Sequence, residues 1–334
     1  MDSMIVICFR GTITLLMLMA LNGCYYLQAA RGQMEIVRKR EPIADVMAAD
    51  GTTPELGARL QLVAEARQFS IDELGLPDND SYRSYADLER DYVIWNVIAV
   101  PEFSLQARTW CYPIVGCVSY RGYFSKDAAQ KLADELRRDG FDVAFGGVVA
   151  YSTLGKLKDP VLSTMMHWGD ADLIAVMFHE LAHQVLYIKD ETGFNESFAT
   201  AVEEFGMQRW LQSRHQPDEL AVWHDRRELR EQFAALIAAT RADLEDLYAS
   251  PADDAVKRQG KQERLAQLTD SAKALFAENG SAAPDWLDSE LNNARLVAST
   301  LYEGRLPEFR TLLLECENDL VCFYNAARKL ADSI

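Results

Sequence analysis

The spacing of apolar and polar residues predicts that helical and extended segments alternate along the chain. Apolar residues recur near helical spacing over residues 25–40 and 54–74, which predicts two helices near the N-terminus. From Tyr92 the pattern changes to short runs rich in β-branched and aromatic residues. These runs predict strands at 92–100, 103–112 and 114–120.

Helix and strand signals follow each other in the next part of the chain. Ser125 is a typical N-cap residue, so we expect an amphipathic helix over 125–138 that ends before Gly140. Residues 141–151 predict another strand. We expect either an extended peptide to pair along its end at 148–151 or that end to be an ordinary interior strand.

Helices dominate the remainder of the chain. Asp170 is expected to cap a helix that reaches about Tyr187, and a second helix is expected to begin at Asn195. Residues 229–247 and 255–276 predict a long antiparallel helix pair. The order of helices, then strands, then helices predicts an α+β fold with a largely helical C-terminal half.

The N-terminus carries a targeting signal. Residues 4–21 are almost wholly apolar apart from Arg10, and the uninterrupted core is typical in length of a signal peptide. The sequence Leu-Asn-Gly-Cys at 21–24 resembles the lipobox of bacterial lipoproteins. We therefore expect residues 1–23 to be a signal peptide and Cys24 to be lipidated. An uncleaved membrane anchor is the alternative.

The residue after the lipobox and the remaining cysteines refine this picture. Tyr25, rather than Asp, follows Cys24, which favours an anchor in the outer membrane with the protein facing the periplasm. In that oxidising compartment, the simplest of three pairings joins neighbours in sequence. We predict the disulfides Cys111–Cys117 and Cys316–Cys322. A four-thiolate zinc site is the alternative, although it requires closer spacing within each pair.

Charge narrows the set of partners. The 334 residues include 34 Lys and Arg against 51 Asp and Glu, giving a formal net charge of −17. A surface that follows nucleic-acid phosphates needs clustered basic residues, so we expect no nucleic-acid partner.

The sequence His179-Glu180-Leu181-Ala182-His183 predicts a metal site. Residues four apart share one face of a helix, so both imidazoles can reach one ion. Glu180 then lies beside the first ligand, where it can act as a general base toward water. Zinc is the ion that this pattern favours, and other divalent ions are alternatives. Two hydrogen-bonded helix histidines without a metal are a further alternative.

A third ligand is expected on the following helix. We predict Glu196 as that ligand, with Glu203 as the next candidate. Glu203 lies seven residues later on nearly the same helix face, so it could instead support a ligand histidine from behind. We expect Glu204 to face solvent.

These motifs together resemble the gluzincin metallopeptidases, in which an Asn-Glu pair on a second helix supplies the third ligand. The spacing between His183 and Glu196 is shorter than in their thermolysin-like and alanyl-aminopeptidase-like branches. The chain is more similar to bacterial lipoproteins described as predicted aminopeptidases or zinc-dependent proteases. This resemblance rests on segments 110–124, 150–155, 159–165, 179–184, 194–200 and 292–296.

The resemblance implies a zincin-like core with a small mixed sheet. We therefore expect four parts along the chain. They are a signal peptide (1–23), an N-terminal helical segment (24–90), a zincin-like α/β catalytic core (91–210) and a helical C-terminal subdomain (211–334).

The resulting hypothesis is a lipid-anchored zinc metallopeptidase acting on peptides, as an aminopeptidase or as an endopeptidase. Glu180 is expected to be the general base. We expect Tyr302 to donate a hydrogen bond to the developing oxyanion, with Tyr151, Tyr187 and His224 as alternatives. A different hypothesis is an envelope scaffold lipoprotein with a structural or vestigial zinc site. A zinc hydrolase of other amides is a third.

Overall fold

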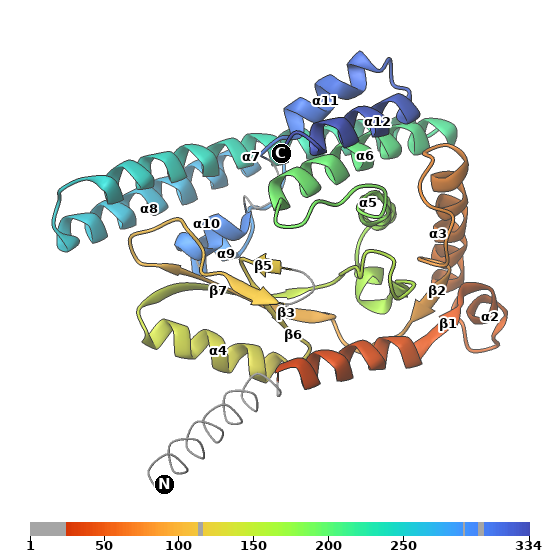
Figure 1. Cartoon of the computed structure of the whole chain (residues 1–334), viewed down its shortest axis with the longest axis horizontal. Helices are drawn as coiled ribbons and strands as arrows, with labels where there is room; N and C mark the ends of the chain where they lie inside the picture. Colours follow the sequence, from red (N-terminus) through yellow and green to blue (C-terminus); the bar gives the residue numbers. More distant parts are fainter. Residues whose placement is uncertain (1–24, 113–115, 290, 300–303) are drawn as a thin grey trace, which may run out of the picture.

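The computed structural model describes residues 25–112, 116–289, 291–299 and 304–334 (Figure 1). It shows an α+β fold in which small sheets are surrounded by helices, as the order of elements predicted. The predicted signal peptide 1–23, the predicted lipidation site Cys24 and the predicted oxyanion donor Tyr302 all lie outside the described residues.

The main sheet is antiparallel. Its central strand β3 (Ile94–Pro101) pairs with β6 (Arg121–Tyr123) on one side and with β7 (Phe141–Val148) on the other. Helix α4 (Lys126–Arg138) packs on one face of the sheet and begins, as predicted, after an N-cap at Ser125. The predicted strand 141–151 ends earlier than expected, at Val148.

A second sheet joins segments that are far apart in sequence. Strand β2 (Ser84–Ala86) pairs antiparallel with β1 (Arg40–Pro42) and parallel with β8 (Val161–Leu162). The helices α2 (Ile43–Ala48) and α3 (Pro54–Asp72) and the 3-10 helix η1 (Ser163–His167) flank it in sequence. Strands of two or three residues carry no readable periodicity, so the sequence predicted α3 but not this sheet.

Both predicted disulfides are confirmed. Cys111–Cys117 closes the hairpin of β4 (Trp110–Tyr112) and β5 (Gly116–Val118), in which the two cysteines are directly paired. Cys316–Cys322 joins the C-terminal helices α11 (Leu306–Glu315) and α12 (Leu320–Ala331).

The predicted strand 103–112 is wrong over 103–109, which contains no strand. The start of this segment instead contacts helices between residues 217 and 299. The backbone carbonyl of Glu102 accepts hydrogen bonds from Lys261 and Asn293, and the ring of Phe103 lies against Tyr248.

Two pairs of neighbouring helices follow each other in the chain (Figure 1). The first consists of α5 (Asp170–Ala182) and α6 (Thr192–Ser213), and the second of α7 (Pro217–Ala249) and α8 (Asp254–Glu278). The second pair confirms the predicted helix pair and extends beyond it. Two short helices, α9 (Trp286–Ser289) and α10 (Asn293–Ser299), connect α8 to α11. No helix in the described ranges is both long and apolar enough to span a bilayer.

Helix α5 differs from its predicted bounds at both ends. Its N-cap is Gly169 rather than Asp170. The Asp170 carboxylate lies in the first turn and forms an ion pair with Arg59 at 3.0 Å. The helix ends at Ala182 rather than near Tyr187. His183 is the C-cap residue and keeps a right-handed helical backbone, so the four-residue spacing between the two histidines is retained.

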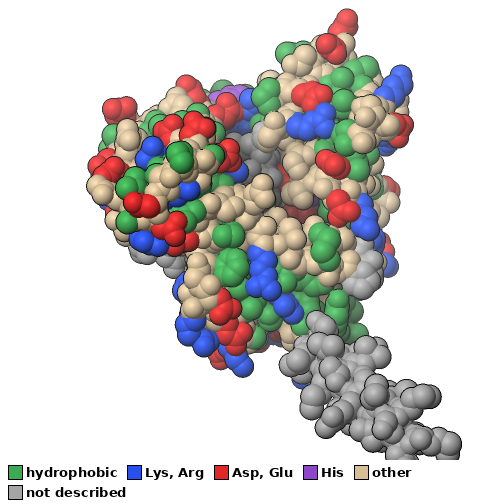
Figure 2. Space-filling view, turned by 60° about the vertical axis from the view of Figure 1, so that its left-hand side comes forward, with side chains coloured by type: hydrophobic (Ala, Val, Ile, Leu, Met, Phe, Trp, Pro, Cys, Tyr) green, Lys and Arg blue, Asp and Glu red, His purple; other side chains and the backbone are tan. Residues whose placement is uncertain are grey.

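The largest hydrophobic core surrounds α5 and α6. It combines side chains from these two helices with side chains from α3 and from the C-terminal helices α11 and α12. A second core lies between the main sheet and the helices α7, α8 and α10. On the face shown in Figure 2, acidic side chains are spread widely and basic side chains lie among them.

Candidate metal centre

The turn between α5 and α6 is fixed by one buried side chain. The amide oxygen of Asn195, a residue that is 1% exposed, accepts a hydrogen bond from the backbone N–H of Ile188 at 2.7 Å. The amide nitrogen donates to the carbonyl of the same residue, also at 2.7 Å. In a longer helix, the N–H and the carbonyl of Ile188 would form hydrogen bonds with other backbone groups. Here the Asn195 side chain forms hydrogen bonds with both, so the chain can turn, and α6 returns alongside α5.

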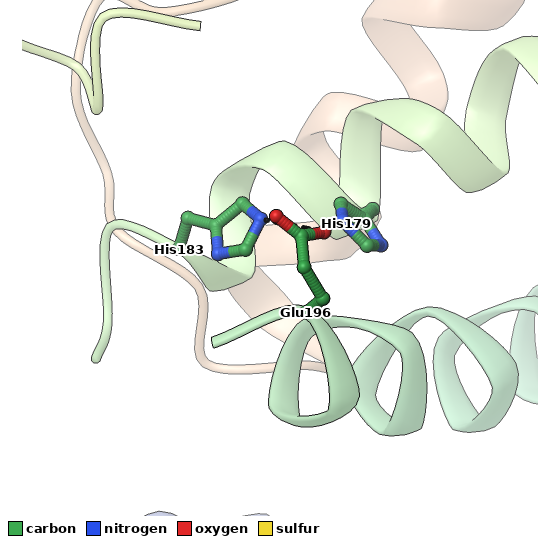
Figure 3. A group of neighbouring side chains, drawn as sticks. All are labelled: His179, His183 and Glu196. Atoms are coloured by element: carbon green, nitrogen blue, oxygen red, sulfur yellow. Dashed lines mark hydrogen bonds and ion pairs between the residues drawn. The ribbon is translucent and has the colours of Figure 1, made fainter. Parts of the chain in front are cut away.

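This return brings three predicted ligands together (Figure 3). His179 Nε2 lies 3.0 Å and His183 Nε2 lies 3.6 Å from Oε2 of Glu196. The ligand atoms of the three residues lie within 4.8 Å of one another. Two imidazoles and one carboxylate are a donor set that suits zinc, and three protein ligands leave a position for water or substrate. The three side chains could therefore hold one metal ion.

The two neighbouring glutamates on α6 have different surroundings. Oε2 of Glu203 lies 3.1 Å from Nδ1 of His179, the ring nitrogen that faces away from Glu196. A carboxylate in this position fixes the orientation of a ligand imidazole. Glu204 was expected to face solvent, and this is wrong. Its carboxylate forms ion pairs with Arg227 and Arg310, and its side chain is only 17% exposed.

The charges of the three groups are strongly coupled. Burial opposes the charged form of Glu196, but hydrogen bonds from His179 and His183 outweigh it and lower the pKa of Glu196 to about 2. Burial likewise opposes the charged form of His179. The hydrogen bonds to Glu196 and Glu203 outweigh it and raise the pKa of His179 to about 10. Without a metal, His179 therefore holds a proton between the two carboxylates, and a bound metal ion would have to displace it.

Glu180 lies in a different environment from Glu196. Burial raises the pKa of Glu180 above its ordinary value, and the carboxylates of Glu196 and Asp159 raise it further, although the two histidines oppose this. A carboxylate with a raised pKa is more basic than an ordinary glutamate, as a group that accepts a proton needs to be.

A loop before α5 forms one wall of the site. The buried carboxylate of Asp159 accepts hydrogen bonds from Ser152, Thr153 and the backbone of Gly155, at 2.6–3.2 Å. Gly155 has φ +73°, and a Cβ there would lie 2.6 Å from the amide oxygen of Gln184, next to His183. The loop is thus closely packed against the C-terminal end of α5, at a position where a residue other than glycine would be strained.

Two phenols flank the candidate metal centre. The ring of Tyr187 lies 6.0 Å from the ring of His183. Tyr120 is 36% exposed, and partial burial together with Tyr187 and the carboxylates of Glu196 and Glu180 raises its pKa to about 12. Sequence reasoning named Tyr187 but missed Tyr120, although Tyr120 lies within segment 110–124 that carried the family resemblance.

Of the two other predicted donors within the described residues, one lies beside the Asp159 loop and the other is exposed. Tyr151 packs against Phe124 and has Asp159 as its charged neighbour, whereas His224 is exposed on α7.

The outer edge of β7 is partly covered. In the described sheet β7 is an edge strand, as a peptide-pairing strand has to be. The side chain of Asn292 donates to the carbonyl of Val143, and Arg295 donates to the carbonyl of Phe145. These contacts occupy the first half of the edge. The predicted peptide-pairing segment 148–151 is not extended beyond Val148.

Comparison with known proteins assigns the chain to a family. The model of a family described as "Putative aminopeptidase" matches residues 24–334, which includes every residue of the candidate site. The chain belongs to this family. No curated protein and no solved structure gives a significant match.

Proposed function

We propose that this family member is a zinc-dependent metallopeptidase with a zincin-like catalytic core. The observation that carries the proposal is the convergence of His179, His183 and Glu196 from two helices, with Glu203 behind His179. Glu180 beside the first ligand favours catalysis over a purely structural site, since a structural ion needs no neighbouring base.

The residues of the site divide the chemistry among them. When bound by His179, His183 and Glu196, zinc would supply Lewis acidity for the scissile carbonyl and lower the pKa of water. Glu180 would take the proton from the attacking water and deliver it to the leaving amine. Tyrosine phenols are protonated at neutral pH at their ordinary pKa of about 10, so either Tyr120 or Tyr187 could donate to the oxyanion.

The position of cleavage within a peptide depends on how the substrate amine is held. An aminopeptidase needs an anchor for the free amine, and Glu203 and Asp190 are two carboxylates near the candidate ligands that could supply one. Glu203 lies against His179, and Asp190 accepts a hydrogen bond from the backbone of Cys117 at 3.2 Å. The family description favours an aminopeptidase. Cleavage of an N-acetylated peptide at the rate of the free peptide would instead assign an endopeptidase.

The decisive experiment is the substitution Glu180→Gln. The variant should keep its zinc, because Glu180 is not a ligand, and should lose about 10²–10⁴-fold in kcat, the usual contribution of a general base. Zinc content and hydrolysis of a peptide library measure the two effects. An unchanged kcat would refute the role of Glu180. A wild-type protein that binds zinc but cleaves no peptide would point to the scaffold hypothesis.

We also propose that Cys24 carries lipid and that the protein is anchored in the outer membrane, facing the periplasm. The lipobox-like sequence before Cys24 supports this part of the proposal. Incorporation of labelled palmitate into the wild-type chain, and not into Cys24→Ala, is the expected result. Incorporation into both chains would refute it.

A further inference from the structure

The helix formed by residues 25–39 is attached to the body of the protein from its first residue. The ring of Tyr25 stacks on Tyr112 with centroids 5.6 Å apart and meets the edge of Tyr123 at 5.4 Å. The guanidinium of Arg121 lies 4.2 Å from the same ring. Gly32 faces the ring of Phe124 so closely that any side chain there would overlap it. No flexible linker therefore separates residue 24 from the folded body.

The opposite side of this helix has a different character. Tyr26, Leu27 and Met34 are 46%, 50% and 52% exposed, large values for apolar side chains. Residues at these spacings share one side of a helix. We call this side the outer face; it consists of Tyr26, Leu27, Ala30, Arg31, Met34 and Arg38. Within the described part of the chain, neither arginine forms an ion pair, in a protein whose net charge is −17. Apolar side chains interspersed with arginines suit the interface of a bilayer.

The chain before this helix indicates what covers the outer face. Residues 4–21 are apolar and end three residues before Cys24. If this segment leaves as a signal peptide, the lipid is attached at Cys24, directly before Tyr25. If the segment stays as an anchor, it ends at Leu21, four residues before Tyr25. The outer face is thus held at the bilayer surface by either route.

The same helix is separated from the candidate metal centre by one hairpin. Tyr112 of β4 contacts Tyr25, and the backbone N–H of Cys117 on β5 donates to Asp190 at 3.2 Å. Asp190 belongs to the turn between α5 and α6, on which Tyr187 approaches His183. The hairpin 110–118 therefore joins the anchored helix to the turn that positions the ligands.

We infer that the outer face of the 25–39 helix lies on the membrane, and that the candidate site acts on peptide segments held at that same surface. This inference rests on the proposed peptidase function. A site with a short and rigid connection to the bilayer meets membrane-attached peptides at a high effective concentration.

The test uses the full chain reconstituted in vesicles of phosphatidylethanolamine and phosphatidylglycerol. A quenched fluorescent peptide mixture is supplied either free or coupled to a phospholipid headgroup through a short spacer. A Gly/Ser linker of about 20 residues, inserted between Cys24 and Tyr25, would give the body about 25 Å of free reach. The insertion should lower cleavage of the lipid-coupled peptide about tenfold and leave cleavage of the free peptide unchanged.

Substitutions test the outer face itself. The double variant Leu27→Glu, Met34→Glu should reduce cleavage of the lipid-coupled peptide several-fold without affecting the free peptide. Val222→Glu and Val256→Glu are matched controls, because these valines are 51% and 53% exposed and lie on α7 and α8, on the opposite side of the molecule in Figure 1. Both controls should behave as the wild type.

A readout independent of peptidase activity separates the two hypotheses. Oxidation of Met34 by hydrogen peroxide should be several-fold slower in the vesicle-bound wild type than in the linker variant. If neither peptide is cleaved but Met34 is protected, the proposed function fails and membrane contact stands. Equal oxidation of Met34 in both proteins would overturn the inference, and so would equal cleavage of the lipid-coupled peptide by both.

Discussion

The two consecutive helix pairs, α5–α6 and α7–α8, use their buried surfaces differently. Helix α6 and the C-cap of α5 bury polar side chains among apolar ones: Asn195, His183 and Ser197 are all less than 7% exposed. The buried residues of α7 are all apolar: Trp223, Leu229, Ile237 and Leu244. Helix α8 buries one charged group, Lys261, which pairs with Asp142 of the main sheet at 2.6 Å.

Burying polar groups costs free energy unless each is paired, and an apolar interface of the same size would avoid that cost. The α5–α6 pair buries polar groups at the candidate metal centre, where the ligand side chains need fixed positions. The α7–α8 pair instead packs against the main sheet mainly through apolar side chains. The difference indicates that substitutions in the first pair should alter metal binding, and substitutions in the second should alter stability alone.

The largest effect is expected at the third ligand. Glu196→Ala removes the carboxylate that both histidines face, so zinc content should fall to background and peptidase activity should disappear. Glu263→Ala removes an exposed carboxylate of α8 and is the matched control, with zinc and activity unchanged. Elemental analysis of the purified variants measures the difference. Retention of zinc by Glu196→Ala would mean that another group is the third ligand.

The next effect concerns the turn that places Glu196. Asn195→Ala leaves the backbone N–H of Ile188 without its partner, whereas the carbonyl keeps the backbone N–H of Glu191 at 3.3 Å, so the change should cost about 1–3 kcal/mol of unfolding free energy. Because the turn sets the position of α6, zinc affinity should also fall at temperatures where the variant is folded. Titration with a chelator measures this. If stability drops and zinc affinity does not, Asn195 stabilises the turn without positioning the ligand.

These residues show why part of the site was predictable from sequence. His179, Glu180 and His183 are related by the local geometry of one helix, and Glu203 is related to Glu196 by two turns of another. Their relative placement therefore follows from spacing. The approach of Glu196 to the two histidines could also be predicted, because it needs only a tight turn between two helices that are adjacent in sequence.

Other features depend on contacts between distant segments, which spacing does not reveal. Glu204 meets Arg227 and Arg310, which lie 23 and 106 residues further along the chain, so its burial was missed. Tyr120 follows strand β5, whose residue Cys117 is hydrogen-bonded to Asp190 of the α5–α6 turn, a link across 73 residues of sequence. The three strands of the second sheet are each held by a partner distant in sequence rather than by their own pattern.

A smaller effect should separate the two adjacent glutamates of α6. Glu203→Gln removes the charged partner of His179 and should weaken zinc binding about 10–100-fold, with little change in stability. Glu204→Gln breaks ion pairs with Arg227 and Arg310, and should lower the unfolding free energy by about 1–3 kcal/mol without weakening zinc binding. Chelator titration measures zinc affinity, and urea unfolding measures stability. If Glu203→Gln lowered stability and Glu204→Gln weakened zinc binding, the roles proposed for the two carboxylates would be reversed.

The smallest effect on function is expected in the second helix pair. Ile237→Ala leaves a cavity in the core between α7, α8 and the main sheet, where Ile237 is 1% exposed. The loss of stability should be about 2–5 kcal/mol. Zinc affinity and kcat/KM, measured well below the unfolding temperature, should equal those of the wild type, because α7 and α8 carry none of the three predicted metal ligands. A variant that stays folded but loses zinc affinity would show that the packing of α7 against the sheet helps to hold α6, and the contrast between the two pairs would then fail.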